Sequence, residues 1–398
     1  MANKNNKFHF AKLERFSAPW VSYKESTSGK YVKSGEDNQF PQHLIELYNR
    51  SSIHAAAVNA TTEAIIGGGL TANVELALSK ANHHGESWND IWTKAAIDFY
   101  LHGSYALEII WSLDRSRIAE VYHIDFSKIR AKEKTHRGHI PGYYISDDWK
   151  RWATPMTDEV QYLPVYNPNK AEEETNQIFV SQEYRPGQEY YPLPTYNAAL
   201  KVIELDTEID SFHVNNIKNG LAPSIAITTF TDSSEDDRKA IEQALRANYG
   251  GTDNAGSMIY MDVPSSDLAP QITPIPQNGA DNYYTTINDL TMQKILTAHR
   301  ITSPMMLGIK TEGQLGGRDE VVDAFLLWFN TVIIPLQQDM LRGFETLLHT
   351  NYPNLIIGVE TKQLYQDGEV EEEIITSVET TSIEDEAINE QKIDQDND

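Results

Sequence analysis

Two pairs of carboxylates lie one helical turn apart in the segment ELDTEID of this 398-residue chain. Glu204 stands four residues before Glu208, and Asp206 four residues before Asp210, so each pair shares one side of a helix. Paired carboxylates can hold a metal ion or transfer protons. We favour the interpretation of the segment as a solvated or channel-facing acidic helix.

A glycine-rich stretch from Gly308 to Gly317 suggests a phosphate-binding loop. Such a loop follows the pattern G-x-x-x-x-G-K-[ST], in which the lysine reaches the phosphates and the hydroxyl holds magnesium. Here Gly308 and Gly313 have the right spacing, but Gln314 and Leu315 follow, and no clear strand precedes them. The sequence therefore predicts no nucleotide site and no cofactor.

The histidines and serines complete no recognisable catalytic motif. His83 and His84 lie in a polar loop, whereas His102 and His123 stand singly beside the ends of expected elements. Neither H-E-x-x-H nor G-x-S-x-G occurs, and the absence of cysteine excludes disulfides and thiolate metal sites. We predict no catalytic residues and no metal. The enzyme hypothesis that stays open is a carboxylate-dependent enzyme acting on nucleic acid or polysaccharide, with its site assembled from distant residues.

The charge of the chain limits the kinds of partner it can bind. Its formal net charge is −25, and the tail over residues 366–398 holds thirteen acidic residues and one lysine. The rest of the chain is also acidic, which argues against a protein that grips nucleic acid through a broad basic surface. No apolar run approaches the roughly 18–20 residues of a membrane span, so no membrane is expected. Residues 1–40 are polar and predict a flexible N-terminal arm.

The apolar spacing predicts an α+β fold. One helix is expected from Pro41 until the glycines that begin at Gly67, and a second from the N-cap Ser87 to His102. Two strands then surround the turn 114–116. Further helices are expected over residues 195–218 and 281–300, with the strands SIAITTF and SMIYMDV between them, and LIIGVETK is expected as a final strand.

The segment over residues 319–349 is apolar on every side where it begins. From Val321 to Ile334 apolar residues cover all faces of the expected helix, and such a helix must be buried all round. The covering surface could be the core of the chain itself or neighbouring copies. Pro335 removes one backbone hydrogen bond and predicts a kink near Thr331 to Ile334.

These elements, in this order, resemble phage portal proteins. The resemblance covers roughly residues 41–365 and rests on the stretches HGSYALEIIW, IKNGLAPS, SIAITTF, LTAHRITSPMMLGI and IIPLQQDML. It implies a portal fold, with the crown at the C-terminus short or absent. The implied divisions are an N-terminal arm 1–40, a wing 41–194, a stem helix 195–220, a small α/β clip 221–280, a stem helix 281–300, a tunnel loop 301–318, a long kinked helix 319–349, a wing strand 350–365 and a disordered acidic tail 366–398.

The resemblance also implies a function without catalysis. Portal proteins form a ring of about twelve subunits at one vertex of the capsid, whose contacts close by cyclic symmetry. Double-stranded DNA passes through the ring during packaging and ejection. The implied partners are the terminase large subunit, the major capsid or scaffolding protein, and head-completion or connector proteins, and the implied location is the virion after assembly in the host cytoplasm. Another structural adaptor of the virion is the alternative.

The resemblance assigns roles to particular residues. The hinge residues are the four glycines and the proline, because glycine gives a loop conformational freedom and proline bends a helix. The acidic stem residues would repel phosphates and keep the channel wall from holding DNA. The expected DNA-facing tunnel-loop residues are Met306, Leu307, Ile309, Lys310, Thr311, Glu312, Gln314 and Arg318; the hinges are Gly308, Gly313, Gly316, Gly317 and Pro335; the channel-lining stem residues are Glu204, Asp206, Glu208, Asp210 and Lys218.

Overall fold

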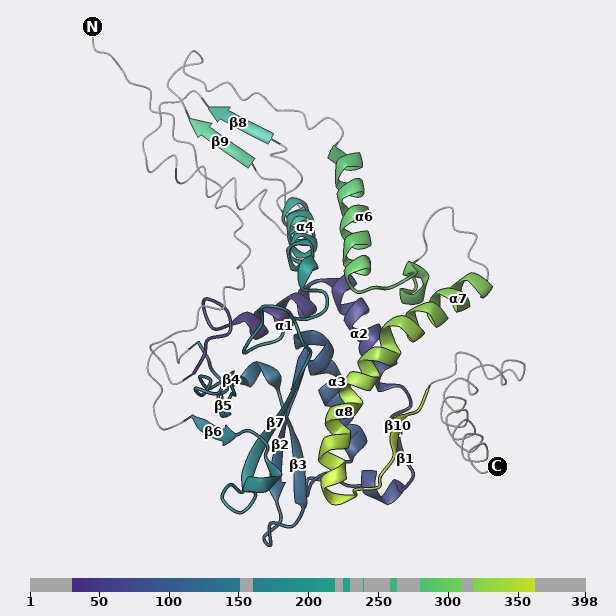
Figure 1. Ribbon diagram of the computed structural model, residues 1–398. Coiled ribbons are helices and arrows are strands. Elements are labelled where there is room, and N and C mark those ends of the chain that lie inside the picture. The colour runs from purple at the N-terminus through teal and green to yellow at the C-terminus, as the bar shows by residue number, and fades with distance from the viewer. Residues whose placement is uncertain are drawn as a thin grey trace. The chain divides into compact units, whose positions relative to one another are not determined.

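The computed structural model describes residues 31–150, 160–218, 225–229, 239, 258–262, 280–309 and 318–361. Within these ranges helices and strands are mixed along the chain, as expected for an α+β fold (Figure 1). The longer helices are α1 (Phe40–Arg50), α2 (Ser52–Ile66), α3 (Trp88–His102), α4 (Leu200–Lys218), α6 (Ala280–Ala298), α7 (Arg318–Trp328) and α8 (Ile334–Asn351), with a π-helical turn η7 (Phe329–Ile333) between the last two. The short 3₁₀ turns are η1 (Glu75–Leu78), η2 (Phe126–Lys128), η3 (Pro168–Lys170), η4 (Asn197–Ala199) and η6 (Pro304–Leu307).

Four small sheets accompany these helices. Strand β2 (Ser104–Trp111) is central in an antiparallel sheet of order β3-β2-β7, and β5 is central in a second antiparallel sheet, β4-β5-β6. Strands β1 and β10 pair antiparallel, and β8 and β9 pair parallel. The remaining strands are β1 (Leu70–Ala72), β3 (Ile118–Ile124), β4 (Ile129–Ala131), β5 (Gly142–Ile145), β6 (Gln161–Pro164), β7 (Asn176–Gln182), β8 (Ile225–Thr229), β9 (Met258–Asp262) and β10 (Ile357–Val359).

The helix ends follow local sequence signals, with one exception. Ser87 caps α3 in a capping box with Asp90, and Gly103 ends the helix in the left-handed conformation, so the expected second helix is confirmed. The single helix expected before Gly67 is wrong. The backbone of Ser51 is extended, at φ −91° and ψ 115°, and its side chain caps the start of α2. The chain therefore breaks into α1 and α2 at a residue whose hydroxyl competes with the helical hydrogen bonds.

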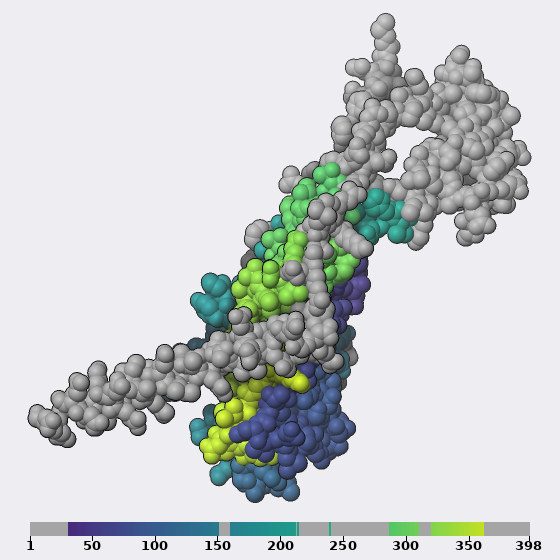
Figure 2. Space-filling view, turned by 90° about the vertical axis from the view of Figure 1, so that its right-hand side faces the viewer, coloured from purple at the N-terminus to yellow at the C-terminus, as the bar shows by residue number. Residues whose placement is uncertain are grey.

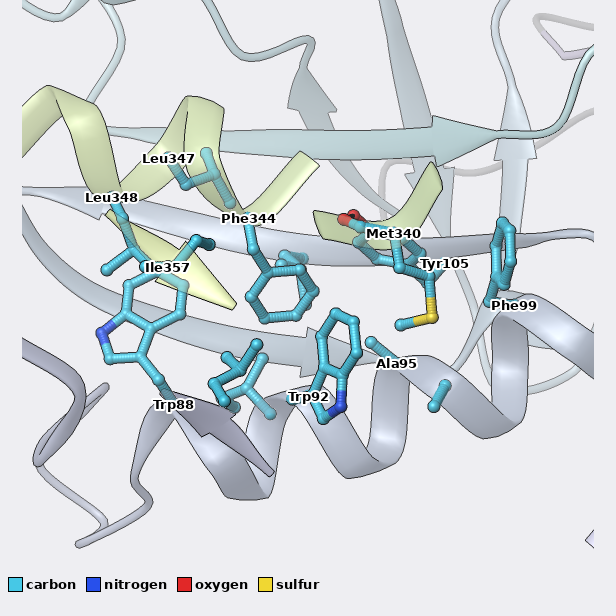
Figure 3. Close-up of a cluster of buried hydrophobic side chains, with 14 of the residues drawn as sticks. Trp88, Trp92, Ala95, Phe99, Tyr105, Met340, Phe344, Leu347, Leu348 and Ile357 are labelled. Atoms are coloured by element: carbon cyan, nitrogen blue, oxygen red, sulfur yellow. Dashed lines mark hydrogen bonds between the residues drawn. The ribbon is translucent and has the colours of Figure 1, made fainter. Parts of the chain in front are cut away.

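The main core lies between α3, α8 and the β3-β2-β7 sheet. Figure 3 shows Phe344 of α8 facing Trp92 of α3, and their ring centroids lie 5.1 Å apart at 77°. Tyr105 of β2 donates a hydrogen bond to the carbonyl oxygen of Met340 over 3.1 Å. Gly343 allows this approach, because a Cβ atom there would lie 2.0 Å from the Tyr105 hydroxyl. The C-terminal half of the long helix is thus a core element of the chain.

The segment just before α1 is packed, so the expected flexible arm is wrong for residues 31–39. Val32 and Asn38 are buried, and Asn38 accepts a hydrogen bond from the Nε of Arg130 over 2.7 Å. The guanidinium of Arg130 is itself fully buried and lies 5.0 Å from the ring centre of Trp149. A buried Arg needs all its donors satisfied, and this need fixes the segment against β4. Residues 1–30 and the tail over 366–398 lie outside the described residues.

Candidate functional site

Helices α4 and α6 contact one another and join the rest of the chain through a shared apolar cluster (Figure 1). Ile203 of α4 and Ile295 of α6 are buried there with Tyr196, whose hydroxyl donates a hydrogen bond over 2.8 Å to the carbonyl oxygen of Leu101, near the end of α3. The cluster holds the described base of both expected stem helices against α1 and α3.

Three of the four acidic residues of α4 pair with side chains of the same chain. Glu204 lies 3.0 Å from the Nε2 of His43 in α1, and Glu208 lies 3.9 Å from a guanidinium nitrogen of Arg50. Asp206 is only 4% exposed and accepts a hydrogen bond over 2.7 Å from the Ser51 hydroxyl.

Burial raises the pKa of Asp206, which marks an enclosed carboxyl group. The expectation that Asp206 lines an open channel therefore conflicts with its burial against α2. Asp210 is exposed. Lys218 is the last residue of α4, and its side chain lies outside what the structure describes.

A chain of buried hydrogen bonds joins the last turn of α6 to α2 and α3. The Nδ1 of His54 lies 2.9 Å from the Nε2 of His299, and the Nδ1 of His299 lies 2.8 Å from the hydroxyl of Tyr100. The Nε2 of His54 is buried and has no partner. A neutral His54 that donates from Nδ1 leaves only an acceptor unpaired, which costs less than a buried N–H without a partner. Burial lowers the pKa of His54 to about 4, so the ring is neutral at pH 7.

The described part of the expected tunnel loop, residues 301–309, packs against the helices. Met306 and Leu307 in η6 are half-buried beside Ala57 of α2 and Ile301. Gly308 ends η6 in the left-handed conformation, at φ +75°, which favours glycine, and Ile309 is also half-buried. The other expected loop residues, Lys310, Thr311, Glu312, Gly313, Gln314, Gly316 and Gly317, lie outside the described residues, and so does the side chain of Arg318.

The α6–η6 connection is hydrogen-bonded to the long helix at its irregular turn. Arg300, at φ +58°, donates from Nη2 to the carbonyl oxygen of Thr331 over 3.0 Å. Thr302 donates to the carbonyl oxygen of Ala324 over 2.7 Å. Thr331 stands four residues before Pro335, and in a regular α-helix its carbonyl would accept from the N–H of residue 335, which proline lacks. Arg300 provides this carbonyl with a side-chain donor.

The structure places the irregularity of the long helix one turn before Pro335. The π-helical turn η7 separates α7 from α8, and π turns commonly cause bends in helices. The sequence had indicated the disturbed segment through Pro335 but not its partner Arg300, which lies 31 residues away from Thr331. No local pattern could have identified that contact.

The first part of this helix is only partly covered by the chain itself: its apolar residues from Val321 to Leu326 are half-buried, and Leu327 is exposed. By length and composition the helix Glu320–Asn351 could cross a membrane, the one such segment among the described residues. Only 33% of its most apolar window is buried. Leu327 of α7 is 57% exposed, and Leu205 and Val214 of α4 and Leu290 of α6 are 44–49% exposed. Figure 2 shows the described parts of α6 and α7 on one face of the molecule.

Comparisons with known proteins agree with this arrangement of elements. The family model described as phage portal protein matches residues 74–344, so the chain belongs to the phage portal protein family. The family is a structural one, and the function of the chain is that of a portal protein in the phage capsid. A search of curated proteins gives no match.

Several solved structures share the fold. A chain in the neck of an empty GTA particle, computed with C6 symmetry, is 13% identical, with 93% of each chain covered and a TM-score of 0.56. A chain in the neck of a native GTA particle, computed with C12 symmetry, is 14% identical, with 91% of each chain covered and a TM-score of 0.55. A chain in the virion of a native gene transfer agent particle is 13% identical, with coverage of 88% of this chain and 89% of that one and a TM-score of 0.54.

Proposed function

We propose that about twelve copies of this chain form a closed ring at one vertex of the capsid, through which double-stranded DNA enters and leaves. The observation that carries the proposal is the uncovered apolar surface of the long helix and of α4 and α6. A helix that is apolar on every side is expected to be buried on every side, so a helix of this kind that stays partly exposed in one copy indicates an interaction surface. A neighbouring copy in a ring can cover them, and the C12 symmetry of the similar neck supports a dodecamer.

The charge of the chain suits a channel that DNA must cross without being held. Channel walls that share the negative net charge of the chain, −25 overall, would repel phosphates. Asp210 is the exposed member of the α4 acidic set. Basic residues at the loop, such as Lys310, would add weak, salt-sensitive contacts that slow sliding.

The proposed partners follow from a ring at a vertex. The terminase large subunit would dock on it during packaging, head-completion or connector proteins would bind it afterwards, and the major capsid or scaffolding protein would surround it. The ring would assemble in the host cytoplasm and remain in the virion. Deleting residues 311–317 is expected to leave rings intact and to impair DNA packaging or retention. Loss of the rings would instead give this loop a structural role.

The enzyme alternative is not favoured by the geometry. Glu204, Asp206 and Glu208 are engaged with His43, Ser51 and Arg50, and they do not converge on a shared open site. We therefore propose no catalytic role for these carboxylates.

Negative-stain imaging of the purified chain tests the ring directly. The variant Leu327→Asp should weaken assembly while the fold is retained, because its side chain is exposed within one copy. The matched control is Leu113→Asp, whose side chain is fully exposed at the β2–β3 turn. Wild type and L113D should both give rings with an axial channel, and L327D should shift to smaller species. A wild-type monomer at every concentration and salt would refute the proposal.

A further inference from the structure

Two carboxylates and a buried imidazole meet where α3 ends and β3 leads into η2. Asp98 and His102 lie one turn apart at the end of α3, and Asp125 caps η2. Each can offer one ligand atom so that the three atoms lie within 4.8 Å of one another. Oxygen or nitrogen ligands of one Zn²⁺ ion, at about 2.0–2.2 Å from it, lie at most roughly 4.4 Å apart. Small side-chain shifts would therefore bring all three onto one ion.

One ring nitrogen of His102 has no hydrogen-bond partner within the chain. Its side chain is 2% exposed, and its Nδ1 is buried without a hydrogen-bond partner. A buried polar atom without a partner is costly and needs an explanation.

Neighbouring groups orient the two carboxylates through hydrogen bonds to one oxygen of each. One oxygen of Asp98, Oδ2, accepts hydrogen bonds over 2.9 Å from the Nε2 of His123 and from the backbone N–H of Phe126. One oxygen of Asp125, Oδ1, accepts from the backbone N–H of Ser127 over 2.9 Å. Such outer contacts are typical of carboxylates that hold a metal.

The surrounding charges are compatible with one divalent cation. Asp98 is buried and Asp125 is half-buried, and the nearby cationic groups are Arg130 and, when protonated, His123. The guanidinium of Arg130 donates its hydrogen bonds to Asn38, Ser127, Ile129 and Gln42, and not to these carboxylates.

We propose that Asp98, His102 and Asp125 form a binding site for one transition-metal cation, with Zn²⁺ as the reference ion. Two oxygens and one imidazole nitrogen suit Zn²⁺ or Mn²⁺, whereas Ca²⁺ and Mg²⁺ prefer oxygen ligands alone. Water would complete the coordination from the half-buried side of Asp125. The ion would connect the end of α3 to η2 and would act in the structure, independently of the ring.

Calorimetric titration of the untagged, full-length chain with ZnCl₂ after removal of metals tests the site. Wild type should bind one Zn²⁺ per chain more tightly than any remaining surface site, and its thermal midpoint should rise. Asp125→Asn should weaken that binding by more than about tenfold. Asparagine is itself a good N-cap, so this variant keeps the η2 cap and its fold. His102→Gln should lose the site as well.

The matched control is His83→Asn, which removes an exposed histidine beside Glu120. It should leave the tight site unchanged. The proposal is overturned if wild type shows no saturable binding, if D125N and H102Q bind as wild type does, or if H83N abolishes the binding. Equal binding of CaCl₂ would overturn the assignment to a transition metal.

Discussion

Lowering the pH from 7.5 to 5 should destabilise the contact between α6 and α2 through His54. The pKa of this buried ring is about 4 in the folded chain, against an ordinary value of 6.5. Between these values the unfolded chain binds a proton that the folded chain does not. The contribution of the neutral His54 to the free energy of unfolding is therefore present above about pH 6.5, and it is lost as the pH falls toward 4.

The size of the effect follows from the two pKa values. At pH 5 the folded state loses about 2 kcal/mol relative to pH 7.5 through His54 alone. Burial also lowers the pKa of His299, which acts in the same direction. Protonation would place a charge at the Nε2 of His54, which is buried and has no partner, and no acceptor would offset the lost solvation.

The variant His54→Asn isolates this contribution. Its amide nitrogen can take the place of Nδ1 and donate to His299, but it does not titrate. Urea titrations at pH 7.5 and pH 5, at one protomer concentration because association adds to apparent stability, should show about 2 kcal/mol less acid destabilisation in H54N than in wild type. The control His84→Asn removes an exposed histidine and should behave as wild type. An equal acid loss in H54N and wild type would refute the reasoning.

Two further predictions concern the long helix. Arg300→Met should cost about 0.5 kcal/mol, because the exposed carbonyl oxygen of Thr331 exchanges its donor for water. It should cost less in a Pro335→Ala background, where a backbone N–H returns. A double-mutant cycle in urea measures this difference, and equal costs in both backgrounds would contradict it. Gly343→Ala should cost about 2 kcal/mol, because its Cβ would lie 2.0 Å from the Tyr105 hydroxyl. The thermal midpoint of G343A checks this, and an unchanged midpoint would show that Tyr105 moves freely.

Sequence patterns predicted those features of the fold that depend on neighbours in the chain. The helix from Trp88 to His102 was predicted from its cap and its terminal glycine, because both act within a few residues. The break at Ser51 was missed because the apolar spacing runs through it. The packing of residues 31–39 was missed because their polar composition is typical of an exposed segment. Asn38 is buried there because it accepts hydrogen bonds from Arg130, which is distant in the sequence.

The candidate site was predicted less completely, because its contacts join segments that are far apart in the sequence. The spacing of the α4 acids shows which of them share a side of the helix, but not that Asp206 meets Ser51. His102 and His299 each stand alone in the sequence. The partner of His299, His54, is 245 residues away, and Asp98, which is near His102 in the chain, belongs to no recognisable motif. A lone residue becomes informative only when its neighbours in space are known.

The sequence by itself determined the strong negative charge, the ends of α3 at Ser87 and Gly103, the disturbed turn before Pro335 and the resemblance to portal proteins. The tertiary structure alone decided which apolar residues the chain covers, which carboxylates it buries, and that Arg300 serves the carbonyl of Thr331. The physical reason is range. Capping, backbone geometry and net charge act locally or simply add up, whereas burial and hydrogen-bond pairing depend on which segments meet across the fold.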